Sequence, residues 1–243
     1  MNSTCFATVD LIGVRVARLD EFGNPISGLE EGYASNAAVS LEIDVVTDGG
    51  DSSVFRNNVG EITAVLLEPE RIIGINLSLE LCQLDALLAE IMLGCDIFTA
   101  GGTAVGVQLP VVGETAHVCF EGWSRAWDGA TAAEHPSTGE PASVHWVFPS
   151  TWWVPGPVRL AHDMSVSTLS TSCAENESMP IAGPFDDWPA NISSAGGVTR
   201  LGGWFMDHMP APATCEYIAV GSNVLLTESF EELLTESFEE ISA

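Results

Sequence analysis

The amino-acid sequence predicts a mainly β fold, an antiparallel domain with one flanking α-helix. Two segments, 39–47 and 72–81, alternate apolar and polar residues with period two, as strands do when they lie between a core and water. A third segment, 83–94, spaces its apolar residues with the period of a helix. Short stretches rich in glycine and proline separate these segments and predict turns.

Strand patterns extend over most of the 243 residues, a length that suits one large all-β domain with a sizeable core. Segment 39–47 places Val39, Leu41, Ile43 and Val45 on one face, and segment 72–81 does the same with Ile73, Ile75, Leu77, Leu79 and Leu81. Further strands are predicted at 13–20, 103–112, 116–123, 144–149, 160–170 and 216–224. Turns are predicted at FGNP (22–25), DGGD (48–51) and EHPSTGEP (134–141).

The helix predicted over about 83–94 has one apolar face. Its members are Leu84, Leu87, Leu88 and Ile91, at i, i+3, i+4 and i+7 spacing. Gly94 stands where a helix ends in a left-handed residue, so the helix is expected to stop there.

The charge balance is strongly acidic. The chain has 34 Asp and Glu against 7 basic residues, all of them arginine, for a formal net charge of −27. Such a surface repels nucleic acid and anionic membranes, because binding to phosphate groups needs clustered Lys and Arg. The excess can serve solubility, reflect a high-salt host, or mark one surface that must not adhere. No targeting segment and no apolar run long enough to span a membrane is found, so no membrane partner is expected.

The polar faces of the two clearest strands carry carboxylates. Glu42 and Asp44 lie on the polar face of segment 39–47, and Glu80 lies on that of segment 72–81. Such a strand lies between a core and either bulk water or an aqueous channel. An ordinary solvated face is the simpler alternative.

No catalytic or metal-binding pattern is found, and neither an enzyme nor a cofactor is expected. The glycines near residue 101 lack the Lys-Ser/Thr of a phosphate loop. His117 and Cys119 point the same way on a strand, but two ligands are too few for zinc. The acidic pair 186–187, followed by Trp188, is a weak cation candidate. The six cysteines never form C-x-x-C and are expected to be reduced thiols.

Several segments together resemble major tail proteins, the tail-tube subunits of long, non-contractile-tailed phages that infect actinobacteria. The resemblance covers about residues 10–220, and it rests on the order and spacing of the segments because no single motif is specific. They are GVRVARLD (13–20) with GNP (23–25), INLSLELCQLDALL (75–88) reaching Gly94, VHWVFP (144–149), MSVSTL (164–169) and GPFD (183–186).

The resemblance implies a β-sandwich or barrel-like fold whose long hairpins complete an inter-subunit β-barrel. Six-fold rings of such subunits stack into a tube through which DNA passes without specific binding. The implied partners are the chain itself and the terminator, tape-measure and distal tail proteins, in the virion tail after a cytoplasmic stage. Glu42, Asp44 and Glu80 are then candidates for the lumen wall. A capsid decoration protein, a tail terminator and, further off, a secreted β-sandwich adhesin are the alternatives.

The C-terminus duplicates the octapeptide LLTESFEE, at 225–232 and 233–240. The sequence is therefore divided into a tail-tube domain, 1–224, and an acidic arm, 225–243, for which the family offers no counterpart. On a helix the apolar residues of both copies fall on one side, which predicts packing on the outside of the tube. A frayed acidic tail is the alternative. The packing candidates are Leu226, Phe230, Leu233, Leu234 and Phe238.

Overall fold

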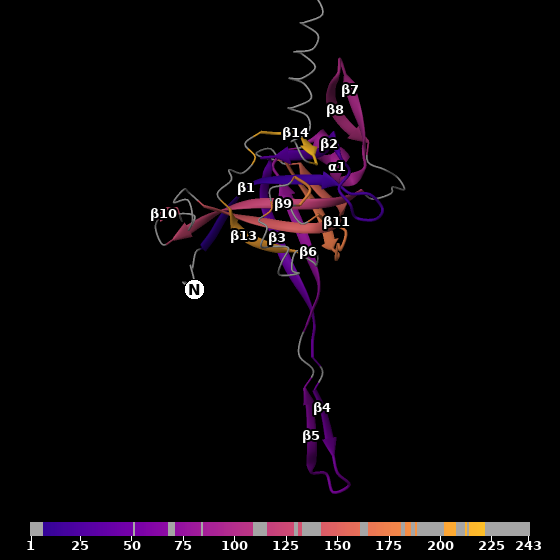
Figure 1. Ribbon diagram of the computed structural model, residues 1–243, viewed down its shortest axis with the longest axis vertical. Coiled ribbons are helices and arrows are strands. Elements are labelled where there is room, and N and C mark those ends of the chain that lie inside the picture. Colours follow the sequence, from indigo (N-terminus) through magenta and orange to yellow (C-terminus); the bar gives the residue numbers. More distant parts are fainter. Residues whose placement is uncertain are drawn as a thin grey trace, which may run out of the picture.

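The main sheet of the computed structural model orders eight strands as β14-β2-β1-β9-β11-β12-β6-β3, with every neighbouring pair antiparallel (Figure 1). In chain order they are β1 (Ala7–Arg18), β2 (Gly28–Ser35), β3 (Ala38–Asp48), β6 (Arg71–Leu81), β9 (His117–Asp128), β11 (Ser143–Leu160), β12 (Ser165–Cys173) and β14 (Glu216–Val220). Two short strands, β10 (Thr131–Ala132) and β13 (Gly203–Asp207), pair with β9 and β11.

The structure describes residues 7–50, 52–67, 71–83, 85–108, 116–128, 131–132, 142–160, 165–180, 183–185, 188, 202–207, 212 and 214–221. Within these ranges the prediction of a mainly β, antiparallel fold with one helix is confirmed. No helix in the described part of the chain is long and apolar enough to cross a bilayer.

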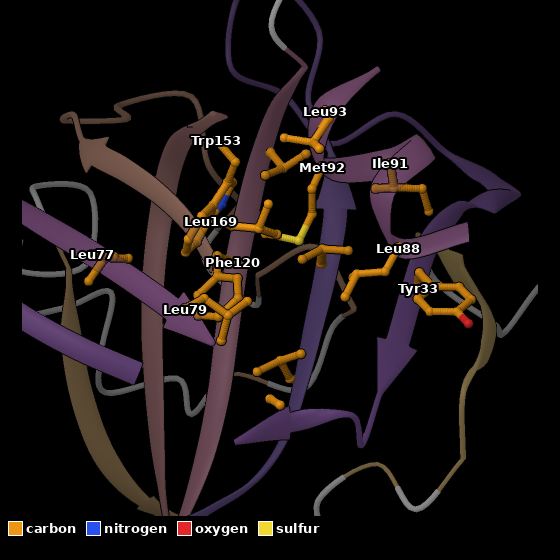
Figure 2. Packing of buried hydrophobic residues seen from close by; sticks show 14 of the residues in the cluster. Tyr33, Leu77, Leu79, Leu88, Ile91, Met92, Leu93, Phe120, Trp153 and Leu169 are labelled. Carbon is orange, nitrogen blue, oxygen red and sulfur yellow. The ribbon is translucent and has the colours of Figure 1, made fainter. Parts of the chain in front are cut away.

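The sheet folds over itself around one main core. Strands β1 and β3 contact each other although they lie far apart in the strand order, as in the two layers of a sandwich. Helix α1 (Ala86–Leu93) packs against the same core, with Leu88, Ile91 and Met92 pointing toward the strands (Figure 2). The large buried residues around them include Tyr33, Leu77, Leu79, Phe120, Phe148 and Trp153.

Helix α1 is shorter than predicted at its first end. It begins at Ala86 because the Asp85 side chain caps it, accepting hydrogen bonds from the backbone N–H groups of Leu87 and Leu88 at 3.1 and 3.2 Å. It ends as predicted at Gly94, which is left-handed with φ 65° and donates its N–H to Glu90 O. Leu84 lies outside the described residues.

Two ribbons of two strands project from the body. Strands β3 and β6 leave it together, and the ribbon of β4 (Ser52–Arg56) and β5 (Ile62–Leu67) continues beyond their ends (Figure 1). We call the four strands β3 to β6 together the arm, and the pair β4 and β5 at its end the arm ribbon. A second ribbon, β7 (Asp96–Ala100) and β8 (Thr103–Gln108), follows α1 and points to the opposite end of the long axis (Figure 1).

One turn prediction was wrong. DGGD at 48–51 does not reverse the chain, because the next strand, β4, continues along the arm. The reversal comes at Asn57–Gly60, where Gly60 has φ 86° and its N–H binds Asn57 O. The FGNP turn at 22–25 is confirmed, while the stretch 134–141 lies outside the described residues.

Candidate assembly interface

The arm exposes the apolar side chains that its alternating pattern would otherwise bury. Along β6, Leu77, Leu79 and Leu81 are buried in the core, whereas Ile72 and Ile73, at a register irregularity nearer the outer end, are 59% and 57% exposed. Strand β3 behaves alike, since Leu41 and Ile43 pack on the core and Val45 is 46% exposed. The pattern therefore extends past the body of the subunit, and in the single chain its outer half has no core to cover it.

The ribbon at the end of the arm is apolar on both faces. In its register Val54 lies opposite Val65, and Phe55 lies opposite Ala64 on the other face. Phe55 is 55% exposed and Val65 is 51% exposed. An isolated two-stranded ribbon is only marginally stable in water, because it can bury neither face. The single chain therefore leaves apolar side chains exposed on both faces of this ribbon.

The turn of the arm ribbon is held by its own polar groups. The Asn57 side-chain oxygen accepts the backbone N–H groups of Val59 and Glu61, at 3.1 and 2.9 Å. The Arg56 guanidinium donates to Gly60 O at 2.9 Å. These bonds define the end of the ribbon while leaving its apolar side chains in solvent.

The second ribbon, β7–β8, is also exposed and apolar. Phe98 is 53% exposed and lies against Gly106, and Val105 is 62% exposed. Its turn contains Gly101 and Gly102, both at positive φ, and a Cβ on either would meet nothing within 4 Å. The outer part of this ribbon therefore projects with Phe98 and Val105 exposed, while Val107 nearer its base packs against the core.

The three acidic candidates lie on one exposed face of the main sheet. Glu42 is paired with Ser78 and Asp44 with Asn76, and the Ser40 hydroxyl donates to the Glu80 carboxylate at 2.9 Å. This face lies opposite the core, since the neighbouring residues along each strand point inward. It continues across β12 and β11 and is hollowed into a groove of about 600 Å³. The groove is lined by Glu42, Asp44, Asn76, Leu77, Ser78, Trp152, Val154, Ser170, Thr171 and Ser172.

A buried ion pair joins strands β1 and β9. Glu121 on β9 is fully buried and receives the Arg15 Nε–H of β1 at 2.7 Å. Its other oxygen accepts the Trp188 Nε1–H at 2.7 Å. The His145 Nε2 lies 3.4 Å from Glu121 Oε2, the oxygen that Arg15 also contacts. Burial by itself raises the pKa of Glu121, but the Arg15 guanidinium and the His145 imidazole lower it to about 2.

Aromatic rings enclose the Arg15 end of this pair. The guanidinium carbon lies 3.9 Å from the centre of the Phe185 ring and 5.0 Å from that of Trp123. Gly183 has φ 77° and lies under Trp188, where a Cβ would approach the indole to 2.4 Å. Phe185 and Trp188 are thus held against the sheet by the buried Arg15–Glu121 pair, so this pair stabilises the fold. Asp186 and Asp187, the weak cation candidates, lie outside the described residues.

The His117 and Cys119 side chains do not form a metal site. His117 Nε2 is 2.8 Å from Ser150 Oγ, and its ring stacks on Trp152 with centres 4.3 Å apart. Burial lowers the pKa of His117, against the opposing effect of Asp20. Cys119 is buried in a separate apolar cluster. The described residues contain no group of three potential metal ligands. Cys82, Cys95, Cys173 and Cys215 are free thiols, and Cys5 lies outside the described part.

The C-terminal packing candidates, from Leu226 to Phe238, lie outside the described residues. So does the proposed boundary at residue 224.

Comparison with protein-family models and with curated proteins finds no match.

Sequence reasoning missed the arm ribbon and its exposed side chains. A signal was present: residues 52–67 carry one arginine and one glutamate, so this stretch is neutral in a chain of net charge −27. Apolar, neutral stretches in an otherwise highly charged chain are typical of contact surfaces. The Asn57–Gly60 sequence, NNVG, also carries residues that favour a reversal.

Proposed function

We propose that this chain is a structural subunit that assembles with copies of itself into stacked six-fold rings, forming the tail tube of a phage with a long, non-contractile tail. The observation that carries the proposal is the arm, whose apolar side chains are exposed on both faces along its outer half. Such a projection is a liability for a monomer, because open strand edges and apolar faces promote association. In a closed assembly the same groups are paired and covered.

The acidic face supports the second half of the proposal, a conduit for DNA. Glu42, Asp44 and Glu80 share this face with serine and asparagine side chains, and no arginine is among the residues that line its groove. A wall of this kind does not retain DNA, because the counterion release that drives binding to phosphates requires Lys or Arg. In a six-fold ring each carboxylate is repeated six times, so we place this face toward the lumen.

Electron microscopy of the purified protein tests the assembly directly. The intact chain is expected to form tubes, or to form them once a nucleating tail protein is added. A variant in which residues 52–67 are replaced by a short Gly-Ser linker is expected to remain a folded monomer, as judged by circular dichroism and light scattering. As a matched control, Leu29→Asp removes an exposed apolar residue on β2 outside the arm and is expected to assemble.

The alternatives give different results in the same experiment. A decoration protein or tail terminator forms trimers or single rings and no tubes. A secreted adhesin stays monomeric and has oxidised cysteines, which a thiol count under denaturing conditions detects. Tubes formed equally well without residues 52–67 would show that the arm is not the assembly element.

A further inference from the structure

The two ribbons have strands of the same lengths and project in opposite directions. The arm ribbon has strands of five and six residues, and β7–β8 also has strands of five and six. They point toward opposite ends of the long axis of the subunit (Figure 1). When copies in the same orientation are stacked along this axis, the arm ribbon of one copy points toward the β7–β8 ribbon of the next.

Charge selects these two surfaces for contact between copies. Residues 52–67 have no net charge, and the β7–β8 ribbon, 96–108, contains a single charged side chain, that of Asp96. The chain as a whole carries −27, so contact elsewhere brings carboxylates together. At the two ribbons that repulsion is smallest, and apolar side chains are available on both partners.

We propose that the arm ribbon of one copy packs beside the β7–β8 ribbon of a copy in the next ring, with the two ribbons pointing in opposite directions. In full overlap the turn of each ribbon lies at the base of the other. Arg56, beside the arm turn, then comes close to Asp96, the first residue of β7. Both residues are exposed in the single chain, so each is available for this contact.

The contact also accounts for the exposed apolar side chains on both ribbons. Val54 and Val65, which share one face of the arm ribbon, would be covered by β7–β8, which presents Phe98 and Val105. Each ribbon has two open edges in the described structure, because β4 pairs with β5 and β7 pairs with β8 alone. The contact is heterologous, so it repeats from ring to ring without closing.

Disulfide trapping tests the register. In a parent chain with Cys5, Cys82 and Cys215 changed to serine, Arg56→Cys and Asp96→Cys are introduced together. Assembled tubes are oxidised and run on a non-reducing gel. A ladder of covalent multimers is expected, and the matched pair Arg56→Cys with Leu29→Cys should give none. Equal ladders from both pairs, or no ladder from assembled 56–96 tubes, would overturn the proposal.

A second set of variants tests the apolar contact. Phe98→Asp with Val105→Asp is expected to raise the concentration needed for assembly about tenfold or more, since two apolar side chains lose their cover. Circular dichroism should show the same fold as the parent. Assembly unchanged by these substitutions would rule out the ribbon pairing.

The inference rests on the proposed self-assembly, and the outcomes separate the two. A parent chain that forms no tubes contradicts the proposed function and, with it, the ribbon pairing. Tubes that need residues 52–67 but tolerate Phe98→Asp and Val105→Asp, or give no 56–96 ladder, contradict the ribbon pairing alone.

Discussion

Trp188 donates its indole N–H to Glu121 over 2.7 Å, and this bond joins a loop residue to a strand that lies 67 positions earlier in the chain. The acceptor is a carboxylate with no exposed surface. The same carboxylate binds Arg15, so one buried negative charge connects β1, β9 and the 183–188 segment. The stability of this side of the molecule should therefore depend on that charge.

Glu121→Gln is expected to lower the free energy of unfolding at neutral pH by about 3–5 kcal/mol, because the buried Arg15 guanidinium loses the Glu121 carboxylate. Urea unfolding followed by tryptophan fluorescence measures the change. Glu21→Gln, at an exposed position, serves as the control and is expected to change little.

The same carboxylate predicts a pH dependence of stability. The folded pKa of Glu121 is about 2, below its ordinary value of 4.5. A depressed carboxyl pKa contributes stability above the ordinary value, and the contribution is lost as the pH falls from about 4.5 toward 2. The difference in unfolding free energy between the wild type and Glu121→Gln should shrink over this range. A difference that stays constant from pH 6 to pH 2 would contradict the ion pair.

Trp188→Phe removes the indole N–H donor but keeps an aromatic ring in the same place. A hydrogen bond to a charged group contributes about 1.5–3 kcal/mol, so a loss of that order is expected in chemical denaturation. Trp152→Phe is the matched control, because the Trp152 ring is partly exposed and stacked on His117. A smaller loss at Trp188 than at Trp152 would argue against the buried bond.

Asp85→Ala is expected to destabilise the fold by about 1–2 kcal/mol through the loss of the helix cap. The effect should exceed that of an ordinary cap, because the Tyr33 hydroxyl also donates to this carboxylate at 2.9 Å. Asp85→Ser keeps a capping oxygen and should recover part of the loss. Thermal unfolding of Asp85→Ala, Asp85→Ser and Tyr33→Phe separates the cap from the tyrosine contact.

Glu42→Arg with Asp44→Arg tests the proposed lumen. Tubes should still form, because both side chains lie on the polar face away from the core. DNA ejection from particles carrying these tubes should slow or stall, most strongly at low salt, where screening is weakest. Arginine at two exposed positions elsewhere, Glu21 and Glu30, is the matched control. Normal DNA ejection from the Glu42/Asp44 variant would contradict the proposal that these carboxylates line the lumen.

Local patterns predicted the helix and the strands β3 and β6 well, but they did not predict β2, β7 or β13. Gly94 could be assigned as the end of the helix, since a left-handed residue after an apolar period depends only on neighbouring residues. Alternation predicted β3 and β6 within a residue or so. It could not predict which part of each strand would be buried, because Ile73 and Leu77 look alike in the sequence and differ only in whether a second layer covers them.

The sequence could not predict which side chains far apart in the chain would contact each other. Arg15 and Glu121 are separated by 106 positions, and nothing near either residue indicates the other. The turn prediction at DGGD failed for a related reason. The composition of these residues favours a turn, but the pairing of the strands along the arm outweighs that preference. Alternation with period two was enough to predict that Glu42, Asp44 and Glu80 share an exposed face. Whether that face points toward the lumen depends on how copies of the chain assemble, which one chain does not determine.

The length of the arm has a consequence for how two copies first meet. A ribbon of six residues extends about 20 Å, since a strand rises about 3.3 Å per residue. The electrostatic field of a charged body in physiological salt decays over about 8 Å. The end of the arm therefore lies beyond most of the ionic atmosphere that surrounds the acidic body. Two subunits can touch through a neutral tip while their bodies are still too far apart to repel each other.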